Sequence, residues 1–299
     1  MKSTTQTSTP LSETIAGRYV LAGAAMISFS GVYVKWAHVG PTVSGFYRVL
    51  IGGLVLVGIS VYRRERWWIN PAYFGWQLIC GLIFALDLFF WHKSVVLTGP
   101  GLATILGNFQ VFLLASVGVI IFGERLTLRL VSSIPAAILG LFLVVGISWQ
   151  ALSPGYRWGV VFGLITAVCY AGYTLSLRYL QSGLRRIPPL PNLAVVSLAS
   201  AAFLGLLALG EGETFSLVDL RTTSAITAYG IFSQVCGWAL ISKGLPGVRA
   251  SLAGLLLLMQ PSLAYVWDMV FFNADITLVK GAGTVITLFA IYLGSTTSR

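Results

Sequence analysis

The chain has 299 residues, of which 57% are hydrophobic and only 9% are charged. Soluble globular domains carry about 25% charged residues, so this composition excludes a soluble fold and requires a surface that mostly faces lipid. The net charge of +10 does not indicate nucleic-acid binding, because the basic residues are scattered in ones to threes between apolar segments. The three cysteines, Cys80, Cys169 and Cys236, lie inside apolar runs, so no disulfide framework is expected.

The sequence predicts an all-α membrane protein with ten transmembrane helices after a polar tail at residues 1–17. Each apolar segment has about twenty residues, which is enough to cross ~30 Å of hydrocarbon as a helix. The predicted spans are 18–36, 43–61, 73–95, 101–122, 129–148, 157–179, 190–209, 222–242, 250–272 and 277–296. Turn residues such as Gly40-Pro41 and Pro188-Pro189 separate neighbouring spans.

The Lys and Arg residues fall unevenly on the two sides of these spans. One side holds thirteen of them and the other holds five, with Arg48 left inside the second span. Cytoplasmic loops carry the excess of Lys and Arg in membrane proteins. The count therefore predicts that both termini, including the N-terminal tail, lie in the cytoplasm. The expected location of this multi-pass protein is the bacterial inner membrane.

The two halves of the chain resemble each other. At an offset of 150 residues, 93–143 and 243–293 share ten identities in 51 positions, including the pair Gln110 and Gln260. We therefore expect a first five-helix repeat at 18–150 and a second at 151–299. Because each repeat has an odd number of spans, the second must enter the membrane from the opposite side. Inverted repeats of this kind are typical of secondary transporters, whose substrate site lies near the midplane between the halves.

Polar side chains deep within the spans mark candidate binding residues, because such groups usually face the bundle interior. Five of them lie about 12 to 20 Å into their spans at ~1.5 Å per residue. Aromatic residues share helical faces with several of these groups. The predicted substrate-binding residues are Asn108, Gln110, Tyr170, Tyr173, Gln234, Trp238, Gln260 and Trp267. The alternative is that the amides only form hydrogen bonds that hold helices together.

Asp87, in the third span, is the one carboxylate plainly within the hydrocarbon. It is a candidate proton carrier or partner for a bound cation. The alternative is a structural ion pair with Arg48, which lies ~8 Å below the end of the second span. We expect His38 and His92 to have ordinary structural roles near the membrane boundary.

One further motif predicts helix packing, and the common motifs of nucleotide-binding and catalytic sites are missing from the sequence. Gly159, Gly163, Ala167 and Ala171 form a small-residue face that lets another helix approach closely. The chain contains no P-loop, no dinucleotide-binding glycine motif, no H-E-x-x-H, no C-x-x-C and no G-x-S-x-G. We therefore expect neither an enzyme nor a resident metal or other cofactor.

Residues 111–140 read VFLLASVGVIIFGERLTLRLVSSIPAAILG and resemble the signature of EamA-type proteins in the drug/metabolite transporter (DMT) superfamily. In that family a helix ends in a Gly-Glu-Arg-Leu-Thr-like turn, here at 123–127. A weaker copy at 260–277 keeps the family's proline as Pro261 but has Ala274 in place of the glutamate, and the first copy has Val111 in place of the proline. Arg48, in the second span, also matches a feature that is common in this family.

Among the subfamilies, the chain looks most like the YddG-type exporters of aromatic amino acids. The resemblance implies a central cavity lined by the first, third, fourth, sixth, eighth and ninth helices, with the fifth and tenth at the periphery. Glu124, beside Arg125 and Arg129, is expected to orient the turn at the end of the fourth span rather than to touch substrate.

The leading functional hypothesis is a secondary transporter that exports amino acids, above all aromatic or hydrophobic ones, and similar amphipathic metabolites by alternating access. A transporter of phosphorylated sugars or of other metabolites and drugs is the alternative, but a phosphate dianion needs at least two deep basic groups. A membrane enzyme lacks a visible reactive cluster, and a selective channel lacks a ring of like charges or a carbonyl filter. The expected partners are a small-molecule substrate and the lipid bilayer, with a monomer as the expected state and no nucleic acid.

Overall fold

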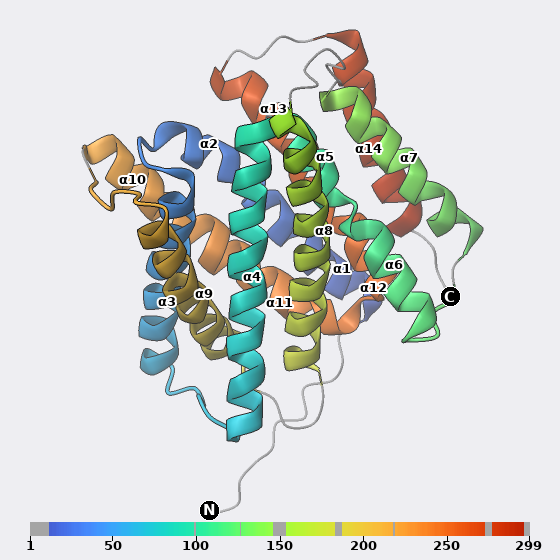
Figure 1. The fold of residues 1–299 in the computed structure, drawn as a ribbon. Helices are drawn as coiled ribbons and strands as arrows, with labels where there is room; N and C mark the ends of the chain where they lie inside the picture. The colour runs from blue at the N-terminus through green and yellow to red at the C-terminus, as the bar shows by residue number, and fades with distance from the viewer. Residues whose placement is uncertain are drawn as a thin grey trace, which may run out of the picture.

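The computed structural model describes residues 12–98, 100–125, 127–145, 154–182, 187–217, 219–272 and 277–295, and the regular structure in these ranges is entirely helical (Figure 1). The first helices are α1 (Glu13–Ile27), α2 (Ser30–Trp36), α3 (Pro41–Tyr62), α4 (Pro71–Thr98), α5 (Pro100–Asn108), α6 (Gln110–Ile120), α7 (Leu128–Val145) and α8 (Pro154–Gln181). They are followed by α9 (Pro189–Gly210), α10 (Leu220–Ala228), the π-helix η1 (Tyr229–Gly237), α11 (Trp238–Gly244), the 3₁₀ turn η2 (Leu245–Gly247), α12 (Ala250–Leu257), α13 (Met259–Phe272) and α14 (Leu278–Ser295).

Eight helical segments in the described residues are long and apolar enough to cross a membrane. They are Glu13–Trp36, Pro41–Tyr62, Pro71–Thr98, Ala103–Ile120, Gly155–Gln181, Pro189–Gly210, Leu220–Gly247 and Ala250–Phe272. The other two predicted spans coincide with shorter apolar helices, Leu128–Leu143 and Leu278–Gly294. Within the described residues the structure is thus all-helical with two repeats, and eight of the ten predicted spans reach full membrane length there. The predicted repeat boundary between 150 and 151, like the first part of the N-terminal tail, lies outside the described residues.

The first span is broken in the middle of the bundle. Between α1 and α2, the hydroxyl groups of Ser28 and Ser30 donate hydrogen bonds to the carbonyl oxygens of Ala25 and Ile27, each at 2.5 Å. Side-chain bonds to carbonyl oxygens on the preceding turn compete with the backbone ladder and often bend helices. These two serines therefore account for a change of direction that hydropathy alone does not reveal.

The fourth and ninth spans break at equivalent positions in the two repeats. α5 ends at Asn108 and α6 begins two residues later, while α12 ends at Leu257 and α13 begins two residues later. The ring of Pro261 explains the second break, because it would clash with the carbonyl group four residues before it. At the first break, the side-chain amide of Asn108 donates to the carbonyl oxygen of Thr104 at 2.8 Å. The 150-residue offset relates the two breaks to within one residue.

The helices pair in a way that respects the two repeats. Extensive contacts join α4 to α8, α7 to α14, α3 to α9, α1 to α11 and α6 to α12, and α4 also packs against α9 just as α3 packs against η1. When each span is replaced by the equivalent span of the other repeat, every one of these helix pairs either becomes another pair of the set or stays the same pair. Figure 1 shows α4 and α8 side by side in the centre, α3 with α9 on the left and α7 with α14 on the right. The helices α7 and α14 lie to one side, as the resemblance implied for the fifth and tenth helices.

Small residues allow one of these contacts to be close. A Cβ atom added to Gly163 in α8 would lie 2.7 Å from the side chain of Leu106 in α5 and 2.9 Å from the hydroxyl of Ser94 in α4. The hydroxyl of Ser94 donates to the carbonyl oxygen of Gly159 at 2.8 Å. The predicted small-residue face of this helix is therefore confirmed as a packing surface against α4 and α5.

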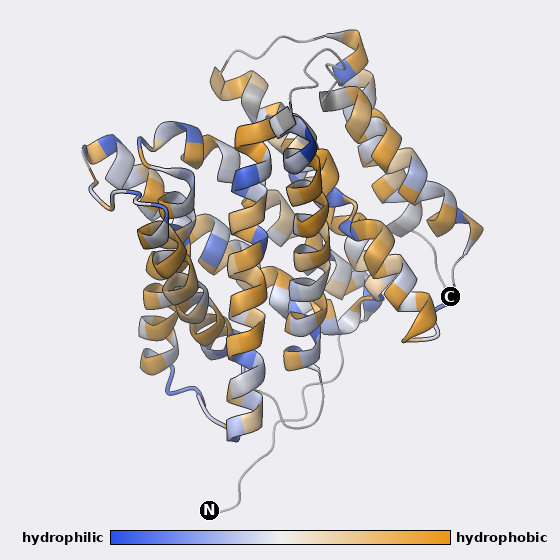
Figure 2. Ribbon diagram, in the orientation of Figure 1, coloured by the Kyte–Doolittle hydropathy of each residue, from blue (hydrophilic) through white to orange (hydrophobic). Residues whose placement is uncertain are grey.

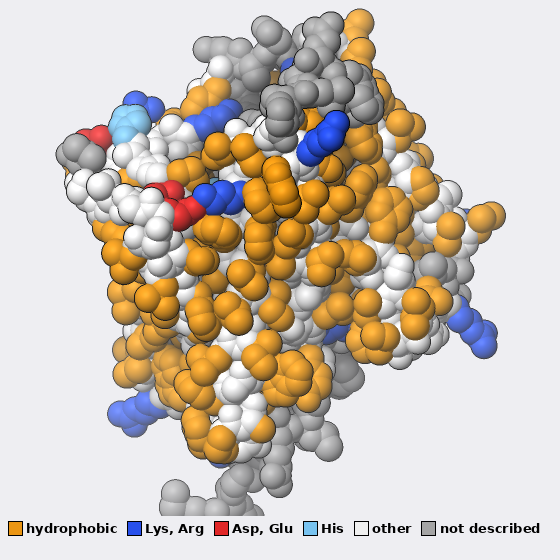
Figure 3. Space-filling view, in the orientation of Figure 1, with side chains coloured by type: hydrophobic (Ala, Val, Ile, Leu, Met, Phe, Trp, Pro, Cys, Tyr) orange, Lys and Arg blue, Asp and Glu red, His pale blue; other side chains and the backbone are white. Residues whose placement is uncertain are grey.

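Apolar and charged side chains are segregated along the bundle. Apolar segments cover most of the length of α4 and α8 in Figure 2, and apolar side chains cover the middle of the face drawn in Figure 3. We call the end at which α1 begins the lower end and the opposite end the upper end, as they appear in Figure 1. Such an apolar belt between two charged ends is the surface expected of a protein that crosses a bilayer.

Candidate functional site

Arg48, in α3, is the only buried Lys or Arg in the described part of the chain, with 5% of the residue exposed. Its Nε donates to Oε1 of Gln234 at 3.2 Å, and its Nη1 donates to the hydroxyl of Tyr229 at 3.0 Å. Nε2 of Gln234 donates in turn to the hydroxyl of Ser197 in α9 at 2.9 Å. The guanidinium carbon also lies 4.8 Å from the ring centroid of Tyr229 and 5.6 Å from that of Phe84. The cation thus joins α3, α4, α9 and η1 in the interior.

The π-helix η1 brings Tyr229 and Gln234 to the same cation. Residues five apart in an α-helix point about 140° away from each other, because each residue turns by about 100°. In a π-helix the backbone bond runs to the fifth residue, so that residue returns to nearly the same face. The sequence indicated Gln234 but missed Tyr229, because α-helical periodicity places the two side chains on different faces. A local π-bulge of this kind is frequent at functional sites.

Aromatic rings form a continuous group beside Arg48. Phe84 stacks on Tyr173 with ring centroids 4.2 Å apart, and Trp238 meets both rings edge-on at 5.6 and 4.6 Å. Tyr170 contacts Trp238 from one further turn of α8, with centroids 6.3 Å apart. Tyr173 and Trp238 are almost fully buried, and neither the Tyr173 hydroxyl nor the Trp238 Nε1 has a hydrogen-bond partner among the described residues. The sequence did not indicate Phe84, because an apolar ring in a span carries no polar signal.

Tyr170 and Gln260 join the sixth and ninth spans. Nε2 of Gln260, in α13, donates to the hydroxyl of Tyr170, in α8, at 2.8 Å. Both residues are partly exposed, unlike Gln234, which is fully buried. Two residues that the sequence placed at the same depth are therefore brought together, and both are only partly exposed.

Gln110 and Asn108 have different surroundings from Gln260. Nε2 of Gln110 donates to the carbonyl oxygen of Gly254 in α12 at 3.4 Å, and the residue is fully buried where α6 crosses α12. Asn108 bonds within its own helix and is 8% exposed. The bond of Gln110 is of the interhelical kind that the sequence left open as the alternative to substrate binding, whereas the bond of Asn108 stays within its own helix.

Trp267 lies at the break in the first span. Its Nε1 donates to the hydroxyl of Ser28 at 2.7 Å, and its ring stacks on Phe29 with centroids 4.1 Å apart. Trp36 continues this contact towards the upper end by meeting Phe271 edge-on at 5.6 Å. The second half of the first span therefore packs against α13 through aromatic rings, with Trp267 partly exposed.

Asp87 is buried in α4, with 7% exposed. Among the described residues it has neither a hydrogen bond nor an ion pair, so the proposed structural ion pair with Arg48 is absent. The charge of Arg48 nevertheless acts on this carboxylate electrostatically. His92, five residues later in α4, is 4% exposed, and neither of its ring nitrogens has a hydrogen-bond partner in the described part of the chain. Buried polar groups without partners are rare and call for an explanation.

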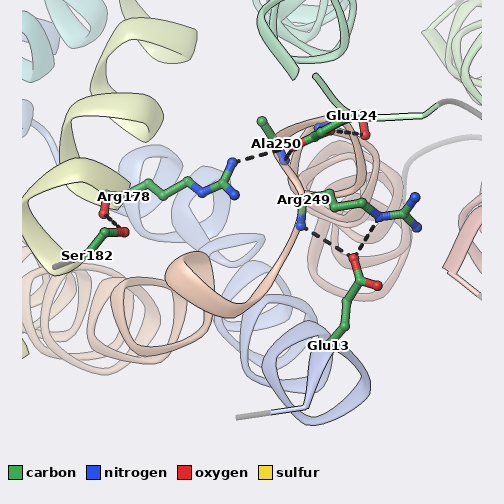
Figure 4. A network of polar contacts seen from close by, with 7 residues as sticks. Glu13, Glu124, Arg178, Ser182, Arg249 and Ala250 are labelled. Carbon is green, nitrogen blue, oxygen red and sulfur yellow. Dashed lines mark hydrogen bonds and ion pairs between the residues drawn. The ribbon is translucent and has the colours of Figure 1, made fainter. Parts of the chain in front are cut away.

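At the lower end, Glu124 connects the two repeats (Figure 4). One carboxylate oxygen accepts from the backbone N–H of Ala250 at 2.6 Å, and the other accepts from the N–H and hydroxyl of Ser251 at 3.2 and 2.7 Å. Arg178 of α8 lies 3.7 Å from the same carboxylate. A carboxylate at a helix N-terminus satisfies free N–H groups and favours the helix dipole. Glu124 is therefore the N-terminal cap of α12, a wider role than the orientation of its own turn.

A second ion pair reinforces this end. Nε of Arg249 donates to Oε1 of Glu13 at 2.8 Å, as Figure 4 shows, so the residue before α12 is also tied to the start of α1. Beside these contacts, α8 packs against α11 and η2, where the buried aliphatic side chains include Leu177, Leu180 and Leu245. The lower end thus combines ion pairs that join the two repeats with packed aliphatic side chains.

The comparisons with known proteins agree with this architecture. The profile of the EamA-like transporter family matches the chain twice, at residues 15–146 and 157–296. One crystal structure, described only as that of a protein, has the same fold, with a TM-score of 0.81, 19% sequence identity, and coverage of 94% of this chain and 98% of the other. No curated protein matches the sequence. Because the two profile matches together take in nearly the whole sequence, the chain belongs to the EamA-like transporter family, whose members are transporters of the drug/metabolite transporter superfamily and not enzymes.

Proposed function

We propose that this transporter exports amino acids with aromatic or large hydrophobic side chains, and similar amphipathic metabolites, by alternating access. The observation that carries the proposal is the adjacency of the Arg48 polar cluster to the aromatic group of Phe84, Tyr170, Tyr173 and Trp238. A polar head and an apolar side chain on one small molecule fit two such neighbouring surfaces.

The aromatic group supports selectivity for ring-bearing substrates. Contacts between aromatic rings contribute roughly 0.5 to 1.5 kcal/mol beyond the area they bury. Since about 1.4 kcal/mol corresponds to tenfold in affinity, phenylalanine should bind about an order of magnitude more tightly than a small polar amino acid such as threonine.

The charge of the interior argues against phosphorylated sugars. A phosphate dianion binds best where at least two positively charged groups contact it. Arg48 is the single buried cation in the described residues, and it already donates to Gln234 and Tyr229. This site is therefore poorly matched to a phosphate group.

The positive charges support an orientation with the lower end in the cytoplasm of a bacterial inner membrane. The helix directions place nine described Lys and Arg residues at or near the lower end, namely Arg18, Arg63, Arg64, Arg66, Arg125, Arg129, Arg178, Lys243 and Arg249. The upper end has Lys35, Lys93, Arg157, Arg221 and Lys280. By the positive-inside rule, the lower end and the termini of the helical bundle face the cytoplasm.

The same residues support a direction of opening. Glu124 and Glu13 bind the α12 terminus and close the lower end, whereas Tyr170, Gln260 and Trp267 remain partly exposed. We infer from these contacts a state whose lower end is closed and whose site opens to the outside, as expected after release of an exported molecule.

The experiment is uptake of labelled phenylalanine into proteoliposomes that contain the purified protein. Unlabelled phenylalanine, threonine and glucose 6-phosphate are then compared as competitors, with protein-free liposomes as the control. We expect phenylalanine to compete best and glucose 6-phosphate not to compete. Strongest competition by the sugar phosphate would contradict the proposed substrate class.

A further inference from the structure

We propose that Arg48 and Asp87 together bind the two charged groups of a zwitterionic α-amino acid, with the carboxylate on Arg48 and the ammonium on Asp87. This inference rests on the proposed function and specifies the head group that the site recognises. It assigns to these two charges a direct contact with substrate in place of a structural ion pair.

The first observation is the separation of two buried opposite charges. Arg48 and Asp87 lie on neighbouring helices, α3 and α4, and are 5% and 7% exposed. Each acts on the other electrostatically, yet no nitrogen of Arg48 lies within 4.0 Å of an Asp87 oxygen. Buried opposite charges that serve stability alone are expected in direct contact, because only close contact offsets the cost of their desolvation. The two charges therefore do not neutralise each other by direct contact, which is the arrangement that a ligand with two opposite charges requires.

The second observation is that Arg48 and Asp87 differ in how many hydrogen bonds they make. Arg48 uses Nε and Nη1 for Gln234 and Tyr229, which fixes the plane of the guanidinium and leaves Nη2 without a hydrogen bond among the described residues. Asp87 has no donor at all in the described part of the chain. An ammonium group offers three N–H donors, and a carboxylate accepts hydrogen bonds from a guanidinium nitrogen. A zwitterion supplies both of the partners that are missing.

The third observation concerns net charge. Arg48 and Asp87 carry opposite formal charges, so a zwitterion enters without changing the net charge of the interior. An amine without a carboxylate adds a positive charge beside Arg48, and an acid without an ammonium adds a negative charge beside Asp87. Either addition places like charges near each other in a region of low dielectric, which is costly. The arrangement therefore selects the zwitterion over its singly charged analogues.

The aromatic group completes the assignment. Phe84 lies one helical turn before Asp87 in α4 and is next to both Arg48 and Trp238. A substrate held by its head group between the two charges therefore has aromatic surface within reach of its side chain. The head group would provide recognition of amino acids in general, while the rings would provide the preference among them.

The test measures binding of three matched ligands to the purified transporter in detergent by calorimetry. The ligands are L-phenylalanine, phenethylamine, which lacks the carboxylate, and 3-phenylpropionate, which lacks the ammonium. The variants are Asp87→Asn, Arg48→Lys and Arg48→Gln. Gln77→Leu is the control, because Gln77 lies lower in α4 and bonds to Asn192 at 2.9 Å, away from the two charges.

We expect wild-type protein to bind phenylalanine about tenfold or more tightly than either analogue, since a hydrogen bond to a charged group is worth about one decade or more in affinity. Asp87→Asn should lose about tenfold for phenylalanine but bind 3-phenylpropionate more tightly than wild type, because the like charge beside that carboxylate is removed. Arg48→Gln should also lose about tenfold for phenylalanine but bind phenethylamine more tightly than wild type, for the same reason. Gln77→Leu should behave as wild type. If Arg48→Gln does not fold, Arg48→Lys and Asp87→Asn decide the question.

The outcomes separate the two proposals. Wild-type protein that does not bind phenylalanine would contradict the proposed function. Wild-type protein that binds phenylalanine no more tightly than phenethylamine, or an Asp87→Asn variant that binds phenylalanine as tightly as wild type, would overturn the charge assignment and leave the proposed function standing.

Discussion

The carboxylate of Glu124 accepts a hydrogen bond from the backbone N–H of Ala250 at 2.6 Å, and this bond links the end of the fourth span to the start of the ninth. The two residues belong to different repeats and are 126 positions apart in the chain. Because this cap joins the two repeats at the lower end, we expect it to be released when that end opens. We therefore expect the hydrogen bonds of Glu124 to α12 to influence whether substrate can reach the site from the lower end.

Removal of this cap should favour opening at the lower end. We expect Glu124→Ala to lower stability by about 0.5 to 2 kcal/mol, the usual cost of losing an N-cap. It should also raise the reaction rate of N-ethylmaleimide with a cysteine at position 242, because Ser242 is buried in α11. The measurement is the labelling rate in a background without the three native cysteines.

Asp219 provides the matched control for this prediction. Its side chain caps α10 at the upper end by accepting from the N–H of Thr222 at 2.6 Å, and this bond is the largest cause that lowers the pKa of the carboxyl group. Asp219→Ala should remove a cap without changing the labelling at position 242. Equal labelling of the Glu124 and Asp219 variants would contradict a specific role for Glu124.

Gln260 and Gln234 should respond differently to replacement by alanine. Gln260→Ala removes a partly exposed hydrogen bond to Tyr170, so transport should weaken with little change in stability. Gln234→Ala removes a fully buried acceptor of Arg48, and loss of a hydrogen bond to a charged group costs about 1.5 to 3 kcal/mol. Thermal unfolding and phenylalanine uptake, measured on both variants, would show the contrast. A Gln260→Ala variant that is as unstable as Gln234→Ala would contradict it.

Asp87 should determine the response of transport to a pH gradient. An asparagine keeps the shape of the side chain but cannot exchange a proton. We expect a pH gradient to stimulate uptake by wild-type proteoliposomes and to have no effect on Asp87→Asn. The ionisable groups that interact electrostatically with Asp87 are Arg48, Cys169, Tyr170 and Tyr173. A folded Asp87→Asn variant with unchanged dependence on the gradient would eliminate the proton-carrier role.

The orientation in the membrane can be tested with two exposed arginines. Arg221 lies at the upper end at the start of α10, and Arg63 lies at the lower end just after α3. In intact cells, a cysteine at position 221 should react with an impermeant thiol reagent, and one at position 63 should react only after the membrane is permeabilised. The reverse pattern would invert the proposed topology.

The predicted spans agree with the helices because apolar segments of membrane length and turn residues such as Pro41, Pro71 and Pro189 leave few alternatives. The break before α13 could also have been anticipated from Pro261. The break in the first span could not, since it depends on two serine hydroxyl groups whose rotamers hydropathy does not reveal.

The candidate site was less accessible to sequence analysis. Depth in the span placed Tyr170 and Gln260 at the same level, and the structure brings them into contact at the break before α13. The sequence did not indicate Tyr229, because the π-helix changes the angle per residue. It did not indicate Phe84, because an apolar residue within an apolar span gives no sign that it packs against a cation. The equivalent glutamines Gln110 and Gln260 occupy different environments, a divergence that symmetry alone would not predict.

The most direct test of amino-acid transport is counterflow in proteoliposomes that contain the purified protein and no other membrane protein. The vesicles are loaded with unlabelled phenylalanine and diluted into buffer with a trace of labelled phenylalanine, without an ion gradient. A transporter for this substrate should accumulate label transiently above its external concentration. Accumulation that does not exceed that of protein-free vesicles would contradict the assignment.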